Sequence, residues 1–274
     1  MNIHDEEQEL ETVQCGYFSD RMSQLEIYQF PSGKTARHLL GTPLFVSEES
    51  AQLMLYADLL SQGFRRSGTL LYRNVCPQCK KCIPIRIDTT QFTFTKRQRQ
   101  LLKRNADIDM RVTKQPEDFI TAKKIQVMRE YNKRHQSEAE HDAETIDDVQ
   151  NMVASMNGLC NQWTGEFFEK PIYAGTQNFD YYASDILVAC SMIDIAENSV
   201  SSNYFYYDLS PENLKRSLGS FSILNEIAWC QQQKIRWYYL GYWISDCKKM
   251  SYKAQFKPHE LRLPDGTWQQ VARV

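Results

Sequence analysis

Three cysteines stand close together in the first third of the chain, at Cys76, Cys79 and Cys82, and they form two overlapping Cys-x-x-Cys pairs. Thiolates at this spacing can converge on one metal ion, as they do in zinc and iron–sulfur sites. Such sites usually need a fourth ligand, and Cys15, in the short motif Cys15-Gly16-Tyr17, is the candidate. A redox dithiol or a turn that reduced cysteines rigidify would show the same spacing. The pattern thus leaves open a structural zinc ion, an iron–sulfur cluster or a metal-free thiol site.

Basic residues gather around these cysteines. Residues 64–104 hold eleven Lys and Arg and one acid, Asp88, although the formal net charge of the whole chain is −2. Residues 1–60 hold ten acids and three bases. A positive segment of this kind is either a solvated face or a surface for a polyanion. Its overlap with the cysteine cluster favours nucleic acid.

Several helices are expected to position these residues. Ser47 as N-cap, two acids behind it and Gly63 as the residue after the last turn predict a helix between them. A basic helix is expected from Thr95 to Asn105. Further helices are predicted over residues 118–133, 145–156 and 222–233, and residues 135–148 are expected to form a loop.

Alternating apolar residues predict strands in both halves of the chain. The predicted strands are residues 69–73, 83–94, 181–183, 186–195, 200–208 and 236–244. Residues 1–14 are polar and are expected to form a loose arm. Cys190 and Cys230 have apolar neighbours and are expected in the core. The succession of strand, strand, helix and strand suggests an α+β layer with helices on one face of the sheet.

The composition narrows the class of protein. The 274 residues are 42% hydrophobic and 12% aromatic, which excludes wholesale disorder. No apolar run approaches the roughly 18 residues that a membrane span needs. The first seven residues are acidic and resemble neither a secretory signal nor a transit peptide. We therefore expect a cytoplasmic protein with reduced thiols and no membrane partner.

Nine short segments carry a resemblance. They are Cys15-Gly16-Tyr17, Gly63 to Gly68 with Leu71-Tyr72-Arg73, Cys76 to Arg86, Arg97-Gln98-Arg99, Lys103 to Asp107, Tyr206-Tyr207-Asp208, Ser217-Leu218-Gly219, Tyr239 to Ile244, and Met250 to Pro258. In this order and spacing they resemble the arginyl/leucyl-tRNA–protein transferases, and most closely the bacterial aspartate/glutamate leucyltransferases. The resemblance extends from about Cys15 to about Leu263.

The resemblance implies a reaction and its partners. Members of this family move an amino acid from an aminoacyl-tRNA to the α-amine of a protein that begins with Asp or Glu, which marks that protein for degradation. Transfer itself needs no cofactor. Eukaryotic members have a second cysteine where this chain has Phe18, and many members have a proline where it has Leu209. The cysteine pattern and the length of the chain are those of the bacterial members, which favours leucyl-tRNA over arginyl-tRNA as the donor.

The resemblance also implies a fold. The C-terminal half of the family is similar to the GNAT acyltransferases. We therefore expect an α+β chain with two domains. An N-terminal cysteine-containing domain with the basic segment would span residues 1–104, and a GNAT-like domain with a mixed sheet flanked by helices would span residues 105–274.

The reaction needs a neutral α-amine as nucleophile and donors for the oxyanion of the tetrahedral intermediate. On the resemblance, the expected catalytic residues are Asp208, Tyr242 and Lys253. Asp208 ends a predicted strand, where its carboxylate could accept or orient the amine proton. The same residue could instead cap the following turn.

The acceptor's acidic side chain suits a fixed cationic fork, which favours arginine. Neighbouring residues on a strand point to opposite faces, so only one of two adjacent arginines should line a given pocket. In the resembled fold, the loop at the place of Ser217-Leu218-Gly219 and the start of the helix behind it present backbone N–H groups to the terminal tRNA phosphate. The expected substrate-binding residues are Arg65, Arg66, Tyr72, Ser217, Gly219, Tyr239 and Tyr252.

The basic helix is expected to contact the tRNA backbone without reading sequence. Its contacts would be Lys96, Arg97, Arg99, Lys103 and Arg104. Two other functions stay open. An acyl-CoA-dependent N-acetyltransferase would show a glycine-rich loop, which Ser217-Leu218-Gly219-Ser220 resembles poorly. A non-catalytic, metal-stabilised RNA-binding module would leave the aromatic second half unexplained.

Overall fold

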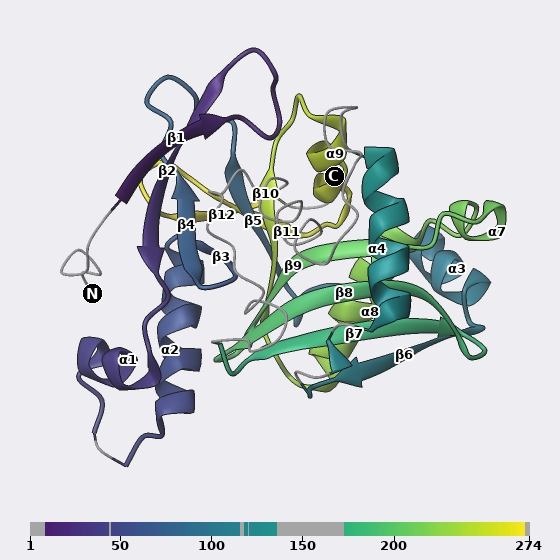
Figure 1. The fold of residues 1–274 in the computed structure, drawn as a ribbon, viewed down its shortest axis with the longest axis horizontal. Coiled ribbons are helices and arrows are strands. Elements are labelled where there is room, and N and C mark those ends of the chain that lie inside the picture. Colours follow the sequence, from purple (N-terminus) through teal and green to yellow (C-terminus); the bar gives the residue numbers. More distant parts are fainter. Residues whose placement is uncertain (1–8, 44, 116–117, 120, 136–172, 272–274) are drawn as a thin grey trace.

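Two β-sheets organise the chain, and helices pack against each of them (Figure 1). The computed structural model describes residues 9–43, 45–115, 118–119, 121–135 and 173–271. Antiparallel pairing dominates both sheets, and runs of up to three consecutive strands are separated by helices rather than alternating with them one by one. The predicted α+β class is therefore confirmed.

The smaller sheet has four antiparallel strands in the order β1-β2-β4-β3. They are β1 (Glu9–Gln14), β2 (Met22–Gln29), β3 (Arg65–Ser67) and β4 (Leu70–Asn74). The expectation of a loose arm is wrong for residues 9–14. This segment pairs with β2 along its whole length, and Val13 packs against Leu25 and Ile27.

Helices α1 (Gly33–Leu40) and α2 (Glu48–Ser61) pack beside the smaller sheet. The side chain of Ser47 accepts a hydrogen bond from the Ser50 N–H at 3.0 Å, which caps α2. Beyond its end, Gly63 has a φ of +90°, a conformation that other residues rarely adopt. The predicted helix between Ser47 and Gly63 is confirmed.

The larger sheet has eight strands in the order β12-β11-β5-β10-β9-β8-β7-β6. They are β5 (Ile83–Asp88), β6 (Ile108–Thr113), β7 (Thr176–Ala183), β8 (Ile186–Ala196), β9 (Ser199–Tyr207), β10 (Trp237–Trp243), β11 (His259–Arg262) and β12 (Trp268–Val271). Among the described strands, β9 and β10 form the one parallel pair.

Helices cover both faces of the larger sheet. Helix α8 (Leu218–Gln232) packs on one face, in a core cluster with Ala189 and Ile193 of β8. Helix α4 (Ala122–His135) packs on the other face, where it contacts β8 and β9. Alternate side chains of β8 therefore serve two cores, and the expectation of helices on one face is wrong.

Four short elements complete the described fold. Helix α3 (Lys96–Arg104) begins with a capping box between Thr95 and Gln98 and packs against α8. The single turn α7 (Pro211–Leu214) precedes α8. Helix α9 (Lys248–Ser251) and the 3-10 helix η4 (Tyr252–Gln255) follow β10. The basic helix predicted from Thr95 to Asn105 is confirmed.

Several predicted boundaries differ from the structure. Strand β5 ends at Asp88, because its carboxylate accepts hydrogen bonds from the Thr90 N–H at 3.0 Å and from Gln91 at 3.1 Å. The prediction of strand as far as residue 94 is therefore wrong. Strand β7 and helix α8 begin before the predicted residues 181 and 222. Helix α4 begins four residues after the predicted start at 118 and ends two residues after the predicted end at 133. The predicted helix 145–156 and residues 136–148 of the predicted loop lie outside the described residues.

The two sheets do not follow the predicted division of the chain at residues 104 and 105. Strand β5 pairs with β10 and β11, and α3 packs on α8, so both elements lie with the larger sheet. The extent of the two domains stays a prediction.

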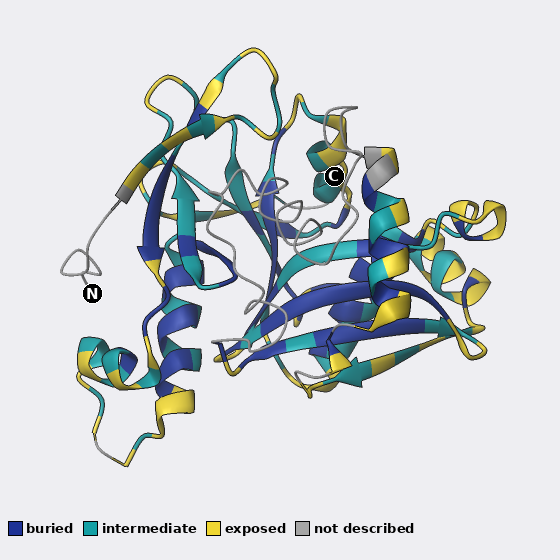
Figure 2. Ribbon diagram, viewed as in Figure 1, coloured by how far each residue is buried: buried dark blue, intermediate teal, exposed yellow. Residues whose placement is uncertain are grey.

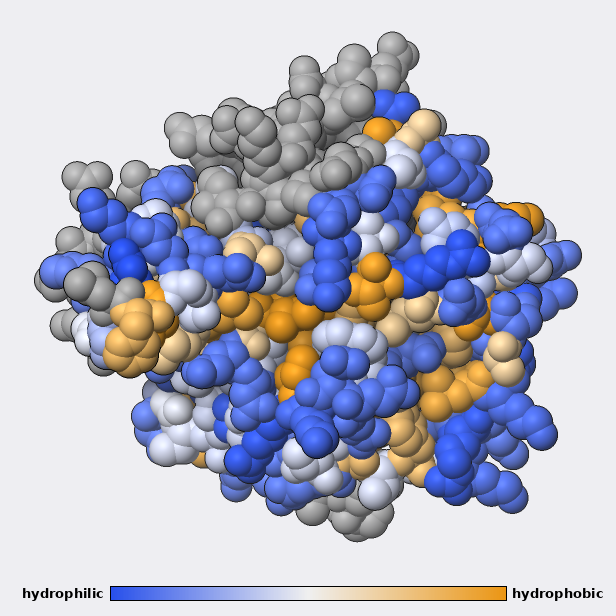
Figure 3. Space-filling model, turned by 90° about the horizontal axis from the view of Figure 1, so that it is seen from below, coloured by the Kyte–Doolittle hydropathy of each residue, from blue (hydrophilic) through white to orange (hydrophobic). Residues whose placement is uncertain are grey.

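Burial follows the two sheets. Figure 2 shows buried residues concentrated in the strands and on one side of α2. As predicted, Cys190 and Cys230 are fully buried. On the face in Figure 3, a band of hydrophobic side chains runs between hydrophilic ones. None of the described helices combines the length and the apolar character needed to cross a bilayer.

Candidate functional site

The candidate site lies where strands β9 and β10 separate. Their parallel pairing runs only from Trp237–Ser199 to Tyr239–Ser201. Beyond this point a cavity of about 780 Å³ opens, lined by residues of both strands from Ser202 and Leu240 onward. The separation leaves backbone groups of the two strands without ladder partners, so side chains and ligands can bind them.

Most of the predicted catalytic and substrate-binding residues line this cavity. They are Arg65, Tyr72, Ser217, Gly219, Tyr242, Tyr252 and Lys253. The described residues of the lining include no aspartate, glutamate or histidine. The site is therefore cationic and phenolic, a character that suits an anionic substrate.

Arg65, on β3, reaches the cavity from the smaller sheet. The residue is only 7% exposed, and its Nη2 donates to the Ser202 carbonyl at 2.6 Å and to Asn203 Oδ1 at 3.4 Å. Its Nη1 is buried and has no hydrogen-bond partner. A buried guanidinium without a carboxylate is costly, so this group is suited to receive an anion.

Gly241 makes room for this guanidinium. It has a φ of +79°, at the irregularity in the pairing of β10 with β5. A Cβ atom at this position would lie 3.4 Å from Arg65 Cζ. Glycine thus satisfies both the backbone conformation and the close approach.

Lys253 is the second cation of the site. Its Nζ donates to the Tyr242 carbonyl at 3.0 Å. Burial, and secondly the charge of Arg65, lower the pKa of Lys253 to about 7. A substantial fraction of Lys253 is therefore an uncharged amine near neutral pH, which can accept a proton.

The predicted tyrosines and the start of α8 lie around the two cations. Tyr242 accepts a hydrogen bond from the Asn74 N–H at 3.3 Å and donates to the Gly63 carbonyl at 3.4 Å. Burial raises the pKa of Tyr242. Tyr252 is 39% exposed at the cavity. Ser217 has a φ of +55° and precedes Gly219 at the first turn of α8.

Three of the predicted catalytic and substrate-binding residues, Arg66, Tyr239 and Asp208, lie outside the described lining of the cavity. Arg66 points to the opposite side of β3, where its guanidinium pairs with the buried Asp194 at 2.6 Å. Tyr239 accepts a hydrogen bond from Arg86 at 3.1 Å and packs in the core.

Asp208 caps a turn rather than facing the cavity. Its Oδ1 accepts from the Ser210 N–H at 2.8 Å and from Asn213 at 3.1 Å. Burial raises its pKa, but these hydrogen bonds outweigh burial and lower the pKa of Asp208 overall. The capping role considered for this residue matches the structure.

A second hollow, of about 540 Å³, adjoins the site at the basic helix. It is lined by Arg97 and Arg104 of α3, and it shares Ser217 and Ser220 with the first cavity. Arg104 donates to Ser217 Oγ at 3.3 Å. All five predicted tRNA contacts are exposed on α3: Lys96, Arg97, Arg99, Lys103 and Arg104.

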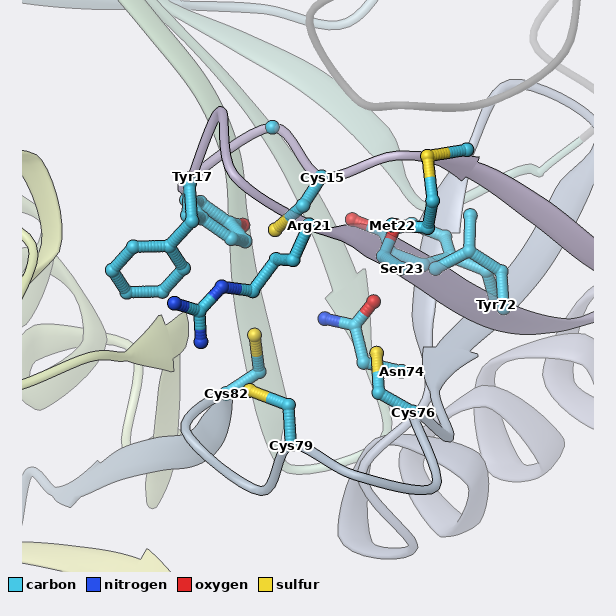
Figure 4. A pocket seen from close by; sticks show the side chains of 13 residues that line it. Cys15, Tyr17, Arg21, Met22, Ser23, Tyr72, Asn74, Cys76, Cys79 and Cys82 are labelled. Atoms are coloured by element: carbon cyan, nitrogen blue, oxygen red, sulfur yellow. The ribbon is translucent and has the colours of Figure 1, made fainter.

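Four cysteines face a separate small pocket of about 40 Å³, namely Cys15, Cys76, Cys79 and Cys82 (Figure 4). Burial, and secondly the other three thiols, raise the pKa of Cys82 to about 12, which disfavours its thiolate. The guanidinium of Arg21 extends toward Cys79 and Cys82. In the described part of the chain, no group of three or more Cys, His, Asp or Glu is arranged to hold a metal ion.

Comparison with known families identifies the chain. The family model of the arginine-tRNA-protein transferase N terminus matches residues 13–100, and that of its C terminus matches residues 123–263. The chain belongs to this family. The resemblance inferred from nine short segments is confirmed, and the two matches together take in both the cysteine pocket and the cavity between β9 and β10.

Curated relatives of this transferase include enzymes named aspartate/glutamate leucyltransferase. The protein from Saccharophagus degradans is 33% identical over 221 residues, which are 80% of this chain and 85% of the relative. The protein from Teredinibacter turnerae is 34% identical over 210 residues, which are 76% and 77% of the two chains. Among solved structures, the transferase is similar to the C-terminal domain of a lysylphosphatidylglycerol synthetase from Agrobacterium fabrum, with 12% identity and a TM-score of 0.44 over 79% of this chain and 62% of that one.

Sequence reasoning missed several residues in or beside the cavity of the transferase. Ser202 and Asn203 contact Arg65, and nothing in their local pattern distinguishes them. Asp194 is buried opposite Arg66. Glu226 did carry a signal, because it is the one acid within residues 218–232 and lies between Ile223 and Ile227 on an apolar face.

Proposed function

We propose that this transferase moves leucine from leucyl-tRNA to the α-amine of proteins that begin with Asp or Glu, and so marks them for degradation. The observation that carries the proposal is the buried, unpartnered Nη1 of Arg65 in a cavity whose described lining has no carboxylate. The acidic first side chain of the acceptor would supply the missing anion. The choice of leucine over arginine is supported by the names of the relatives.

In this proposal the acceptor binds with its carboxylate on Arg65 and its α-amine near Lys253, since both cations line one cavity. The amine nitrogen attacks the carbonyl carbon of the aminoacyl ester, and the bond to the ribose oxygen of the tRNA breaks as the tetrahedral intermediate collapses. The uncharged fraction of Lys253 accepts the proton that the amine loses. Positioning of the acceptor by Arg65 and Lys253 contributes much of the rate.

The donor would enter along the basic helix. We propose that α3 binds the tRNA backbone through its exposed Lys and Arg, and that the 3′ end passes Ser217 and Ser220, which line both hollows. The larger sheet with α8 would then be the acyltransferase part of the chain. This arrangement is supported by the positive charge of α3 and by Ser217 and Ser220, which line both hollows.

The cysteine pocket has no step in this mechanism. A structural zinc ion or iron–sulfur cluster at Cys15, Cys76, Cys79 and Cys82, which line one pocket, stays a prediction. Elemental analysis of the protein purified under reducing, oxygen-free conditions decides it. One equivalent of zinc or several of iron per chain would confirm the prediction, and the absence of both metals would contradict it.

A transfer assay tests the function. Purified protein is supplied with leucyl-tRNA or arginyl-tRNA and with peptides that begin with Asp, Glu, Asn or Ala. The proposal predicts leucine transfer to the Asp and Glu peptides only. Transfer of arginine alone would overturn the donor, and transfer to Asn and Ala peptides would overturn the role of Arg65. Acetylation of the same peptides from acetyl-CoA without tRNA would favour an N-acetyltransferase.

A further inference from the structure

A buried carboxyl group lies close to the cavity, and the side chain of one serine that lines the cavity interacts with it. Glu226 of α8 is fully buried beneath the site. Its Oε1 accepts from Ser191 Oγ at 2.6 Å, and its Oε2 accepts from the Tyr238 hydroxyl at 2.5 Å. The side chain of Ser202 also interacts with the carboxyl and lowers its pKa, and Ser202 lines the cavity.

The sheet brings Ser202 to this place through an irregularity. The pairing of β8 with β9 shifts between Met192 and Ile193, so that Asn203 is left out of the register and Ser202 pairs with Ile193. Ile193 lies in the core cluster beneath α8, whereas Met192 lies in the cluster beneath α4. The shift thus turns Ser202 toward α8 and Glu226, at the point where β9 leaves β10.

The surroundings of Glu226 disfavour its ionised form. The titratable groups that interact with it are Tyr181, Tyr238, Tyr252 and Cys230, and no cation is among those that the structure describes. Burial raises the pKa of Glu226 above its ordinary value, although hydrogen bonds from Ser191 and Tyr238 oppose this. Burial therefore favours an uncharged acid at Glu226, just as it favours an uncharged base at Lys253.

We propose that Glu226 supplies, through Ser202, the proton that the departing ribose oxygen of the tRNA takes up. As the bond between the carbonyl carbon and that oxygen breaks, the Ser202 hydroxyl donates its proton to the oxygen and receives one from Glu226. The carboxylate that forms is held by hydroxyl groups of Ser191 and Tyr238. The proton gained by Lys253 from the amine later returns to Glu226 through solvent in the cavity and the Ser202 hydroxyl, since Lys253 and Ser202 line the same cavity. Glu226 is a positioning residue, because it acts through Ser202.

This inference rests on the proposed function. We test it by measuring single-turnover transfer of leucine to a peptide that begins with Asp, from pH 6 to 10. The wild-type rate should fall as the pH rises through the raised pKa of Glu226, because the relay then lacks its proton. Glu226→Gln and Ser202→Ala should each lower the rate roughly 100-fold and abolish the fall with rising pH. The double variant should be no slower than either single variant. Ser202→Thr, which keeps the hydroxyl, should recover most of the rate.

Ser199→Ala is the matched control, because Ser199 is a buried serine of the same strand, β9, and does not line the cavity. It should keep the rate within about threefold and keep the fall with rising pH, because it has no part in the relay. Thermal unfolding of each variant separates loss of rate from loss of fold, and Ser202→Ala decides the matter if Glu226→Gln does not fold. A folded Ser202→Ala variant with wild-type rate and pH profile would overturn the relay alone. A wild-type protein without transfer would overturn the proposed function and the relay with it.

Discussion

At the scale of single residues, two adjacent arginines have opposite environments. Arg66 is held by Asp194 through two hydrogen bonds of 2.6 and 2.8 Å, with both side chains about fully buried. Arg65 has carbonyl and amide partners and one unpartnered nitrogen. A satisfied ion pair stabilises structure, whereas an unsatisfied cation is available to a ligand. The two residues should therefore respond differently to substitution.

Replacing Arg65 by Met should lower kcat/KM for peptides that begin with Asp roughly 10- to 100-fold, the effect of losing a charge-assisted hydrogen bond. The midpoint of thermal unfolding should change little, because the substitution removes a cation that lacks a carboxylate partner. The preference for Asp over Asn at the first position should also disappear. An Arg65→Met variant that still prefers Asp over Asn tenfold would show that another group recognises the acid.

Lys253 should set the acidic side of the pH profile. Its pKa of about 7 predicts that the single-turnover rate rises with pH through about 7, as the uncharged amine forms. Lys253→Arg keeps a permanent charge and should be much slower. The remaining dependence should then follow the peptide α-amine, whose ordinary pKa is about 8. A profile that does not move between wild type and Lys253→Arg would remove Lys253 from proton transfer.

At the scale of elements, the site depends on two irregularities in otherwise regular strands. Strand β10 stops pairing with β9 after Tyr239, and its pairing with β5 shifts near Gly241. The carbonyls of Ser202 and Tyr242 are thereby free to hold Arg65 and Lys253. Helix α3 adds exposed positive charge beside this opening.

Helix α3 should control the salt dependence of tRNA binding. Lys96, Arg97 and Lys103 are exposed, and replacing all three by Ala should weaken binding at low ionic strength. The slope of log affinity against log salt should fall by about 0.7–0.9 for each lost phosphate contact. Filter binding over a range of salt concentrations measures this. Lys34→Ala, on the exposed side of α1, is the control and should leave the slope unchanged; an equal effect of both changes would contradict the assignment to α3.

Helices and most strands could be predicted from the sequence because their signals are local. The cap at Ser47 and the nearly continuous apolar run of residues 186–193 each lie within one element. The pairing of β1 with β2 depends instead on contacts between segments, which a polar sequence does not show. Strand geometry predicted that Arg65 and Arg66 would separate, but not which of them faces the cavity. That choice depends on Asp194, about 130 residues away.

At the scale of the whole molecule, the site exists only where the two sheets meet. Arg65 and Tyr72 come from the smaller sheet, and Ser202, Tyr242 and Lys253 come from the larger sheet and its C-terminal helices. The ion pair of Arg66 with Asp194 crosses the same boundary, from β3 to β8. Fold stability and the geometry of the site are therefore coupled across the sheets.

A chain of hydrogen bonds connects the buried ion pair of Arg66 and Asp194 to Arg65 in the cavity. Asp194 accepts from Asn203 at 2.6 Å, and Asn203 in turn accepts from Arg65 at 3.4 Å. Arg66→Met leaves a buried carboxylate without its cation and should lower the free energy of unfolding by about 3–5 kcal/mol. Adding Asp194→Leu removes that carboxylate and should recover much of the loss, as chemical denaturation would show. Transfer to Asp peptides should stay low in the double variant, because Asn203 has lost the partner that orients it toward Arg65. Recovery of stability and transfer together would show that the pair serves the fold alone.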